Sequence, residues 1–218
     1  MMASTSEPRQ GVAQGTLYIV SAASGTGKTS LVRALAERQA DTIISVSHTT
    51  RAQRTGEVEG EHYHFVDAAV FSGMLERAEF LESALVFGNR YGTSQAHVQK
   101  QLKRGVSVIL EIDWQGARQV RKQMPCITIF VLPPSLETLR ARLEGRGQDS
   151  SGVIDERMRG AADELSHYAE FDYLLVNDDF ETACGELQSI MQATNLLATR
   201  QHPRHAALIA SLLGASPE

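Results

Sequence analysis

The stretch that decides the fold is "TLYIVSAASGTGKTS", residues 16–30. A short apolar run ends at Val20, a glycine-rich turn follows, and a helical pattern begins at Thr29. Nucleotide-phosphate loops have the pattern Gly, four residues, then Gly-Lys-Ser/Thr, placed between a strand and a helix. Gly27, Lys28 and Thr29 match the end of this pattern, whereas Ala22 stands at its first position. A chance glycine-rich turn is the alternative, but both flanking patterns favour a phosphate-binding loop.

Each part of this loop has a predicted chemical role. Backbone N–H groups surround phosphate oxygens, and the helix that follows adds its N-terminal dipole. Gly25 and Gly27 give the necessary backbone freedom, Lys28 reaches the β- and γ-phosphates, and the Thr29 hydroxyl can bind Mg²⁺. Ala22 does not exclude the site, because a strand end needs only a backbone angle open to L-residues. The residues predicted to bind a nucleoside triphosphate here are Ala22, Ala23, Ser24, Gly25, Thr26, Gly27, Lys28 and Thr29.

Short apolar runs that alternate with helical patterns predict the fold class. The runs are too short for core helices, and continuous apolar runs suit strands buried on both faces of a parallel sheet. Strands that alternate with helices form right-handed βαβ units. We therefore expect an α/β fold with an open, mainly parallel sheet flanked by helices. The five strand runs are 16–22, 42–47, 107–113, 126–132 and 172–177, and helical patterns cover 29–39, 94–105, 114–124 and 134–147, the last with Ser135 as its N-cap.

Two segments interrupt this alternation and predict the domain organisation. Residues 48–93 are polar and glycine-containing, with a short helical pattern at 68–77, and we expect a small, mostly β lobe there. The irregular stretch 145–153 joins two arginine-bearing helices and is expected to be a mobile flap. The predicted parts are a disordered tail (1–14), a P-loop core (15–47 and 94–195) with a lid segment at about 138–160, the inserted lobe (48–93) and a helical C-terminal tail (196–218). We expect the C-terminal tail to pack on the body or on another subunit, and in the second case the protein would be a homo-oligomer.

Composition narrows the class of protein and of partner. The 218 residues are 42% hydrophobic and 22% charged, as in ordinary globular proteins. A net charge of −5 favours neither nucleic acid nor an anionic membrane as partner. No apolar run approaches membrane-spanning length, and the N-terminus lacks the apolar core of a signal peptide. Cys126 and Cys184 have no metal-ligand spacing and suit the reduced thiols of a cytoplasmic protein.

Two groups of arginines are candidate anion-binding residues. Arg51 and Arg54 lie among hydroxyl residues in the inserted lobe, and guanidinium groups suit bidentate contacts with a phosphate. Arg142 and Arg146 are four residues apart on one helix face, and Arg157 follows the flap. Charged, solvated surfaces are the alternative for both groups. The functional prediction is a phosphate clamp in the lobe and a lid that brings positive charge onto a transferring phosphoryl group.

Three carboxylates are candidates for base recognition and metal binding. Glu82 and Asp113 lie in largely apolar surroundings. A carboxylate can accept hydrogen bonds from N1–H and the N2 amino group of guanine, and adenine lacks both donors. Such a site can reject the wrong base by about 10⁴-fold. Asp113 with Glu111 can also order Mg²⁺ through water, whereas an exposed strand-edge position is the alternative for Glu82.

With these residues in view, the sequence resembles the guanylate kinase family, of bacterial type. The resemblance covers about residues 16–195 and rests on "SGTGKTSL", "SVSHTTRAQRTGEVEGEHY", "FGNRYGTS", "ILEIDWQGARQV", "LPPS", "RLEGRGQDS" and "LLVNDDF". The "SHTTR…R.GE..G..Y" block is far more specific than the phosphate loop. The resemblance implies a GMP-phosphate clamp made of Ser47, Arg51, Arg54, Tyr63 and Tyr91, and guanine contacts from Glu82, Thr93 and Asp113. It also implies catalytic roles for Lys28, Arg51, Arg142, Arg146 and Arg157, and it places Asn177 beside the ATP base.

The resemblance also implies an activity. The family transfers the γ-phosphoryl group of ATP to GMP, with Mg²⁺ as cofactor, and dGMP is an expected second acceptor. The chain departs from the family pattern at Arg90, where Tyr is frequent, and at Glu111, where Asp is frequent. Two alternatives remain at this point: a phosphopeptide-binding module of the guanylate-kinase-like type, and a related P-loop kinase with another phosphorylated acceptor. The intact Gly27-Lys28-Thr29 triplet argues against the first alternative, and the Arg51, Arg54, Tyr63 and Glu82 set against the second.

Overall fold

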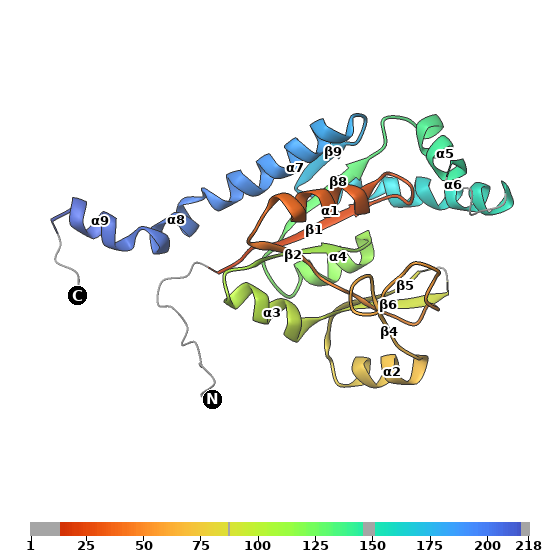
Figure 1. Ribbon diagram of the computed structural model, residues 1–218, viewed down its shortest axis with the longest axis horizontal. Coiled ribbons are helices and arrows are strands. Elements are labelled where there is room, and N and C mark those ends of the chain that lie inside the picture. Colours follow the sequence, from red (N-terminus) through yellow and green to blue (C-terminus); the bar gives the residue numbers. More distant parts are fainter. Residues whose placement is uncertain (1–13, 87, 146–150, 215–218) are drawn as a thin grey trace.

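The computed structural model describes residues 14–86, 88–145 and 151–214. A five-stranded sheet forms the core, with strand order β2-β7-β1-β8-β9 and parallel pairing throughout (Figure 1). The predicted α/β class with a mainly parallel sheet is therefore confirmed. The strands of this sheet are β1 (Leu17–Ala22), β2 (Thr42–Ile44), β7 (Ser107–Glu111), β8 (Ile127–Leu132) and β9 (Tyr173–Val176).

A second sheet of four strands lies below the first in Figure 1, in the order β4-β3-β6-β5. Its pairing is mixed: β3 and β4 are parallel, whereas β3–β6 and β5–β6 are antiparallel. All of its strands come from residues 48–94, and the sequence predicted a small β lobe at 48–93. The strands are β3 (His48–Thr49), β4 (His64–Phe65), β5 (Phe80–Val86) and β6 (Asn89–Ser94), and helix α2 (Ala68–Glu76) connects β4 to β5.

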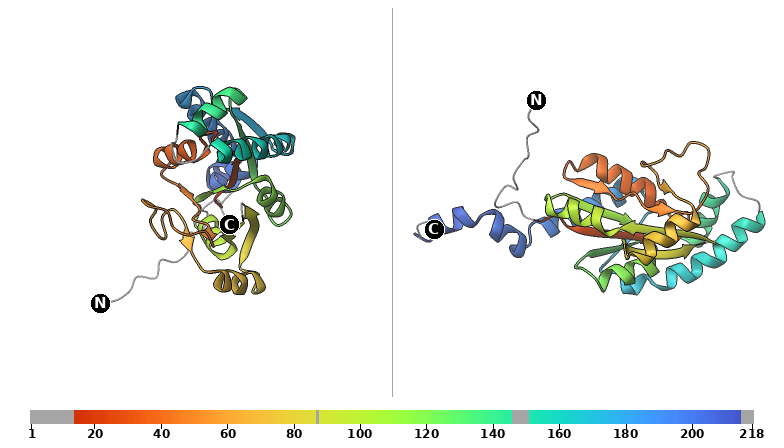
Figure 2. Two further views of the ribbon diagram at one scale, coloured as in Figure 1. Left: turned by 90° about the vertical axis from the view of Figure 1, so that its right-hand side faces the viewer. Right: turned by 90° about the horizontal axis from the view of Figure 1, so that it is seen from below.

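Helices cover both faces of the core sheet (Figure 2).

Two helices begin at side-chain caps. The predicted Ser135 cap is confirmed, because its hydroxyl accepts a hydrogen bond from the Thr138 backbone N–H at 3.1 Å. Asp113 caps the start of α4 in the same way, through the Gly116 N–H at 2.9 Å. The remaining helices are α1 (Lys28–Arg38), α3 (Gln95–Lys103), α4 (Trp114–Arg121), α5 (Leu136–Glu144), α6 (Ser151–Ser166), α7 (Phe180–Asn195), α8 (Ala198–Arg204) and α9 (Ala206–Leu212).

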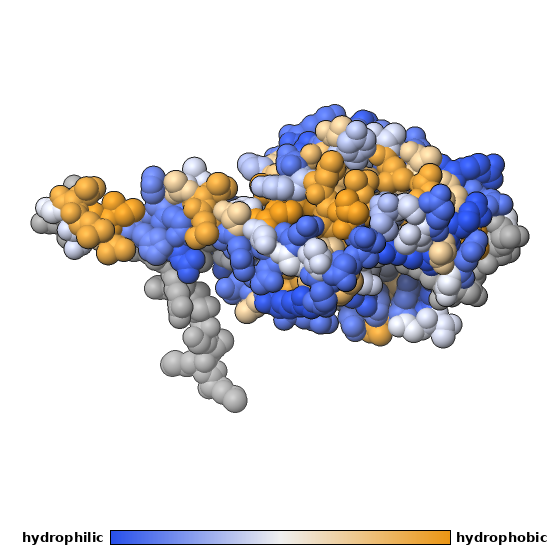
Figure 3. Space-filling view, turned by 90° about the horizontal axis from the view of Figure 1, so that it is seen from above, coloured by the Kyte–Doolittle hydropathy of each residue, from blue (hydrophilic) through white to orange (hydrophobic). Residues whose placement is uncertain are grey.

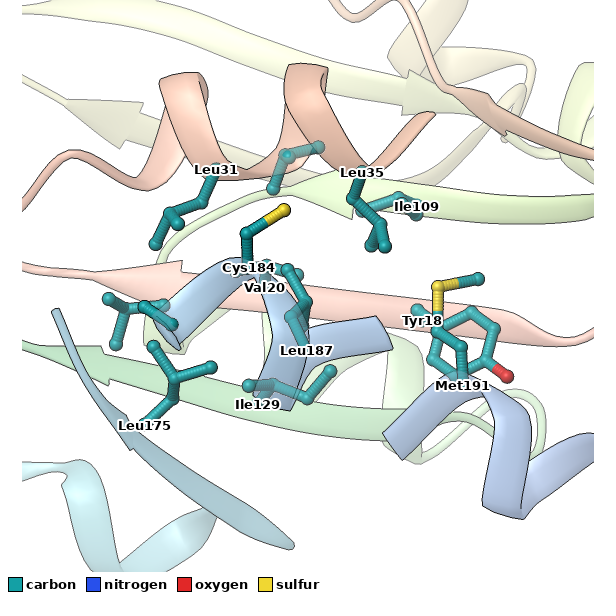
Figure 4. Close-up of a cluster of buried hydrophobic side chains, with 13 residues drawn as sticks. Tyr18, Val20, Leu31, Leu35, Ile109, Ile129, Leu175, Cys184, Leu187 and Met191 are labelled. Atoms are coloured by element: carbon teal, nitrogen blue, oxygen red, sulfur yellow. The ribbon is translucent and has the colours of Figure 1, made fainter. Parts of the chain in front are cut away.

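The alternation of side chains along β1 produces two separate cores. Tyr18 and Val20 point to the face covered by α1 and α7, where they pack with residues such as Leu35 and Leu187 (Figure 4). Leu17 and Ile19 belong to the cluster on the other face, which α3 and α4 cover. Because successive side chains of a strand point to opposite faces, the apolar run of β1, which has no alternation, is buried by helices on both sides. This packing fixes the position of the loop that follows β1.

The prediction of burial on both faces is wrong for β9. Tyr173, Leu174 and Val176 are 40–50% exposed, and Leu175 is the buried residue of the strand. The physical reason is its position at the edge of the sheet, where only β8 pairs with it. One large side chain of β9, Leu175, joins the core beneath α7.

The C-terminal segment extends away from the body as α8 and α9 (Figure 1). Neither helix has a buried residue, and Leu208, Leu212 and Leu213 are 56–77% exposed. Apolar side chains are visible along this extension in Figure 3. The prediction that the C-terminal tail packs on the body is therefore wrong for α9, because its leucines are exposed to solvent. The other predicted alternative, packing on another subunit, stays a prediction. The predicted tail (1–14) lies outside the described residues except for Gln14.

Candidate active site

The carboxyl ends of the core strands meet at one edge of the sheet, and the candidate site lies there. In an open parallel sheet, ligands bind outside this edge. The phosphate loop follows β1, and Glu111 and Asp113 stand at the end of β7. A cavity of about 320 Å³ opens between the two sheets. It is lined by loop residues 22–30 together with Ser47, Tyr63, Glu82, Ala84, Val86, Tyr91, Glu111, Ile112, Asp113 and Glu164.

The phosphate loop has the conformation that its glycines allow. Gly25 and Gly27 have φ angles of 93° and 91°, in the left-handed region that favours glycine. A Cβ on Gly27 would lie 2.5 Å from Nδ2 of Asn177. That amide donates a hydrogen bond of 2.6 Å to the carbonyl of Thr26 and is itself buried. Ala22 ends β1 in extended conformation, so the absence of glycine at the first loop position costs no backbone strain.

The start of α1 brings a hydroxyl and a carboxylate together. Lys28 is the first residue of the helix and lines the cavity. The Thr29 hydroxyl donates to Oε2 of Glu111 at 2.8 Å. Glu111, the longer side chain at a position where the resemblance suggests Asp, therefore reaches the loop. Asp113 also lines the cavity, but one of its oxygens is used to cap α4.

These oxygen ligands fit a magnesium ion held mainly by nucleotide phosphates. Mg²⁺ in nucleotide sites keeps several waters and takes one or two protein oxygens. The Thr29 hydroxyl and the Glu111 carboxylate supply such oxygens beside the loop. Among the described residues there is no cluster of three or more His, Cys, Asp or Glu side chains that would hold a metal alone. The two protein oxygens beside the loop suit an ion whose other ligands are nucleotide phosphates and water.

A buried carboxylate lies in the wall of the cavity formed by the second sheet. Glu82 is 3% exposed, and its Oε1 accepts a hydrogen bond of 2.6 Å from the Thr93 hydroxyl. The antiparallel register of β5 and β6 places these two residues opposite each other. Burial raises the pKa of Glu82 to about 7, and the negative charge of Asp113 contributes in the same direction. The site thus holds a carboxylate that a ligand with N–H donors would stabilise in its ionised form.

The arginine pair of the inserted segment is organised by a glutamate. Nη2 of Arg51 lies 2.6 Å from Oε1 of Glu57, and Oε2 of Glu57 accepts from the Arg54 backbone N–H at 2.8 Å. The Arg51 guanidinium also lies 5.4 Å from the ring centroid of Tyr63, within cation–π range. Tyr63 in turn contacts Tyr91 edge to face at 5.9 Å. Arg51 is therefore held in place before any anion binds.

A smaller cavity of about 220 Å³ lies next to this clamp and brings in α6. Tyr91 lines both cavities, so the two adjoin at its ring. Arg157 faces the same space as Arg51 and Arg54, although it is about 100 residues away in the sequence. The lining residues are Arg51, Arg54, Asn89, Tyr91, Val153, Glu156 and Arg157.

The other two predicted lid arginines have different positions. Arg142 donates from Nη1 to the Thr26 carbonyl at 3.2 Å and from Nη2 to the Asn177 carbonyl at 2.9 Å. Its guanidinium therefore supports the phosphate loop through backbone oxygens. Arg146 lies outside the described residues.

The chain matches a known protein family over most of its length. The family model described as "Guanylate kinase" matches residues 14–194. The chain belongs to the guanylate kinase family. A guanylate kinase of Pseudomonas fluorescens is 57% identical over 92% of this chain and 98% of its own length. One of Salmonella typhimurium is 58% identical over 93% of this chain and 99% of its own.

A solved structure extends the similarity to the fold. The crystal structure of guanylate kinase from Anaplasma phagocytophilum has a TM-score of 0.76 and 34% identity, and the match covers 94% of this chain and 98% of that one. The match therefore extends over nearly the whole length of both chains. Membership in the guanylate kinase family therefore rests on sequence and on fold together.

Sequence reasoning missed two glutamates of this guanylate kinase site. Glu57 lies within the specific motif block, three residues after Arg54, so its spacing could have indicated a partner for the arginines. Glu164 gave no such signal, because it lies in an ordinary helical sequence on α6. The structure places its Oε2 3.0 Å from the Ser24 backbone nitrogen, inside the phosphate loop. Only the packing of α6 against the loop shows this contact.

Proposed function

We propose that the protein transfers the γ-phosphoryl group of ATP to the 5′-phosphate of GMP, giving ADP and GDP. Membership in the guanylate kinase family supports this activity over a phosphopeptide-binding module and over a kinase for another acceptor. The observation that carries the choice of guanine is the buried Glu82, paired with Thr93, in the same cavity as the phosphate loop.

The donor nucleotide would occupy the loop. The backbone N–H groups of residues 22–29 and the N-terminus of α1 attract its phosphates, and Lys28 adds a point charge on the β- and γ-phosphates. Asn177 holds the Thr26 carbonyl and so fixes the loop conformation beside the proposed base site. Mg²⁺ would be held by the phosphates and the Thr29 hydroxyl, with Glu111 and Asp113 ordering its waters, and would neutralise the charge on the transferring group.

The acceptor nucleotide would lie between the two sheets. Arg51, already oriented by Glu57 and Tyr63, and Arg54 would bind its phosphate together with Ser47 and Tyr91. At the other end, Glu82 would accept hydrogen bonds from guanine N1–H and N2–H, with Thr93 and Asp113 beside it. Hydrogen bonds from guanine would offset the free-energy cost of burying the charged Glu82 carboxylate, whereas adenine has no donors at these positions.

The chemical step needs positioning and charge neutralisation but no general base. The attacking group is a phosphate oxygen that is mostly ionised at neutral pH, since its second pKa is about 6. The obstacle is repulsion between two polyanions, which Lys28 and Arg51 reduce while they align the groups for in-line transfer. Arg157 faces the acceptor side of this space. Arg142 would have to exchange its two carbonyl partners to reach a phosphoryl group, and Arg146 completes the proposed catalytic set.

A single assay tests the proposal and its alternatives. ADP formation from ATP and Mg²⁺ is measured with GMP, dGMP, IMP and AMP as acceptors. We expect efficient use of GMP and dGMP, weaker use of IMP because it lacks the N2 amino group, and little use of AMP. Loss of turnover with excess EDTA, restored by Mg²⁺, would support the cofactor. Equal use of AMP and GMP would refute guanine recognition by Glu82.

We further propose a cytoplasmic enzyme of purine nucleotide metabolism that does not use nucleic acid or membrane as partner. Cys126 and Cys184 are free thiols, which suits a reducing compartment. In the described parts of the chain, none of the helices has the length and apolarity needed to cross a membrane.

The exposed leucines of α9 favour a homo-oligomer. Light scattering at several protein concentrations measures the mass of the particle in solution.

A further inference from the structure

The contact between Glu164 and the phosphate loop is used nowhere in the proposed reaction. Glu164 lies in the last turns of α6, and its Oε2 accepts a hydrogen bond from the Ser24 backbone N–H at 3.0 Å. Both residues line the cavity of about 320 Å³, as does Lys28. A carboxylate thus lies in a loop whose backbone N–H groups and lysine are suited to bind phosphate.

Packing holds the carboxylate in this place. Ala161, one turn before Glu164, is buried in a small cluster with Ala23 of the loop and Leu139 of α5. Met158 and Leu165 pack against the same cluster. Because α6 is fixed to the loop on both sides of Glu164, the contact with Ser24 does not depend on a freely rotating surface side chain.

The surroundings of Glu164 are partly unfavourable for a charge. Burial raises its pKa, and the like charge of Asp113 acts in the same direction. The Ser24 N–H and the positive charge of Lys28 act against this and stabilise the ionised carboxylate. The favourable contacts of Glu164 are therefore with groups that a nucleotide phosphate would also use.

We infer that Glu164 takes the place of a nucleotide phosphate at the Ser24 end of the loop, and that it lowers the affinity of this site for ATP and ADP. Phosphate oxygens that enter the loop meet a like charge and compete for the same N–H group and the same lysine. The carboxylate must then withdraw from Ser24, and the bond can form again when ADP leaves. Glu164 is thus an affinity-determining residue of the donor site, and this inference rests on the proposed function of the loop.

The test is the affinity of the full-length Glu164→Gln variant, measured by titration calorimetry. Glutamine keeps an acceptor for the Ser24 N–H but removes the charge. We expect Kd to fall about three- to tenfold for ATP, ADP and inorganic tripolyphosphate, and to stay unchanged for GMP. The matched control is Asp163→Asn, which removes one negative charge from the adjacent, exposed residue of α6. Its Kd values should stay within about twofold of wild type.

The outcomes separate this inference from the proposed function. A wild-type protein without GMP-dependent ADP formation would refute the proposed function, whatever the affinities are. A wild-type protein that has this activity, with a Glu164→Gln variant that binds ATP and tripolyphosphate equally or more weakly, would refute the role of Glu164. An equal gain in Asp163→Asn would also refute it, because the effect would then be one of net charge.

Hydrogen exchange on the unmodified protein gives an independent test. If ATP phosphates displace Glu164, ATP should protect the loop residues and at the same time increase exchange in the last turn of α6, around residues 161–166. Protection of both segments, or no change in α6, would contradict the inference. This measurement does not depend on the folding of any variant.

Discussion

The phosphate loop and the proposed acceptor site line one cavity but are built on different principles. The loop is a run of consecutive residues, 22–30, whose ligand-binding groups are mostly backbone N–H groups. The proposed acceptor site is on the other side of the cavity, where separate strands and connections supply the lining residues Ser47, Tyr63, Glu82, Tyr91 and Asp113. The first site needs the right backbone shape, whereas the second needs the right side chains brought together by two sheets.

This difference has a consequence for mutational sensitivity. A side-chain replacement leaves backbone donors in place, so the donor site keeps much of its affinity unless its lysine or its glycines change. In the proposed acceptor site the contacts would come from side chains, so each replacement would remove a specific interaction. Variants of the two regions should therefore have different kinetic signatures.

Lys28→Ala should have the largest effect, a loss of about 10⁴-fold in kcat, because no other loop side chain supplies a positive charge to the β- and γ-phosphates. The fold should persist, since Lys28 is not part of either main core cluster. Steady-state kinetics and a thermal melt measure the two quantities. Lys100→Ala, on the exposed surface of α3, is the matched control. A Lys28→Ala variant with near-normal kcat would break the assignment of the loop.

Glu82→Gln should lower kcat/KM for GMP by about 10³-fold, with the KM for ATP nearly unchanged. Glutamine would place an NH₂ group where guanine also presents donors, and one donor would remain unpaired. Competition assays with GMP, IMP and AMP measure the change in selectivity. Glu61→Gln, on the exposed loop of the inserted segment, should leave selectivity intact. Unchanged GMP use with AMP still rejected would place guanine recognition elsewhere.

Arg51→Ala should raise the KM for GMP by about 10²-fold, since a hydrogen-bonded charge on phosphate is lost. It also leaves Glu57 without its guanidinium partner. The KM for ATP should change little. Lys28→Ala, in contrast, should act on kcat. Arg77→Ala removes an arginine that pairs with Glu79 at the surface, and it serves as control. An equal loss for ATP and GMP would mean that Arg51 serves both regions.

The smallest effect should come from pH, because Glu82 must be ionised to accept bonds from guanine. With its pKa raised to about 7, the carboxylate is mostly protonated at pH 6 and mostly ionised at pH 8. The KM for GMP should therefore be about tenfold higher at pH 6 than at pH 8. The GMP phosphate also titrates near pH 6, so the profile of Glu82→Gln gives the correction. The same pH dependence in this variant would show that Glu82 is not the titrating group.

Much of the fold could be predicted from local patterns. The five apolar runs became the five core strands, and the predicted helix at 68–77 is α2, because both signals arise from neighbouring residues. The exposure of β9 could not be predicted, since an apolar run has the same sequence whether it lies at the centre or at the edge of a sheet. The extended position of α8 and α9 could not be predicted either, because helical periodicity does not say what a helix packs against.

The candidate site divides in the same way. By itself, the sequence determined the phosphate loop, since its function depends on consecutive residues and on the left-handed backbone at Gly25 and Gly27. Motifs and the family resemblance predicted the arginines and Glu82 as binding residues, but they did not predict the contacts of these side chains. Only the tertiary structure decided that Glu82 pairs with Thr93 and that Glu164 contacts Ser24. The physical reason is that these contacts follow from strand register and helix packing, which join residues far apart in the chain.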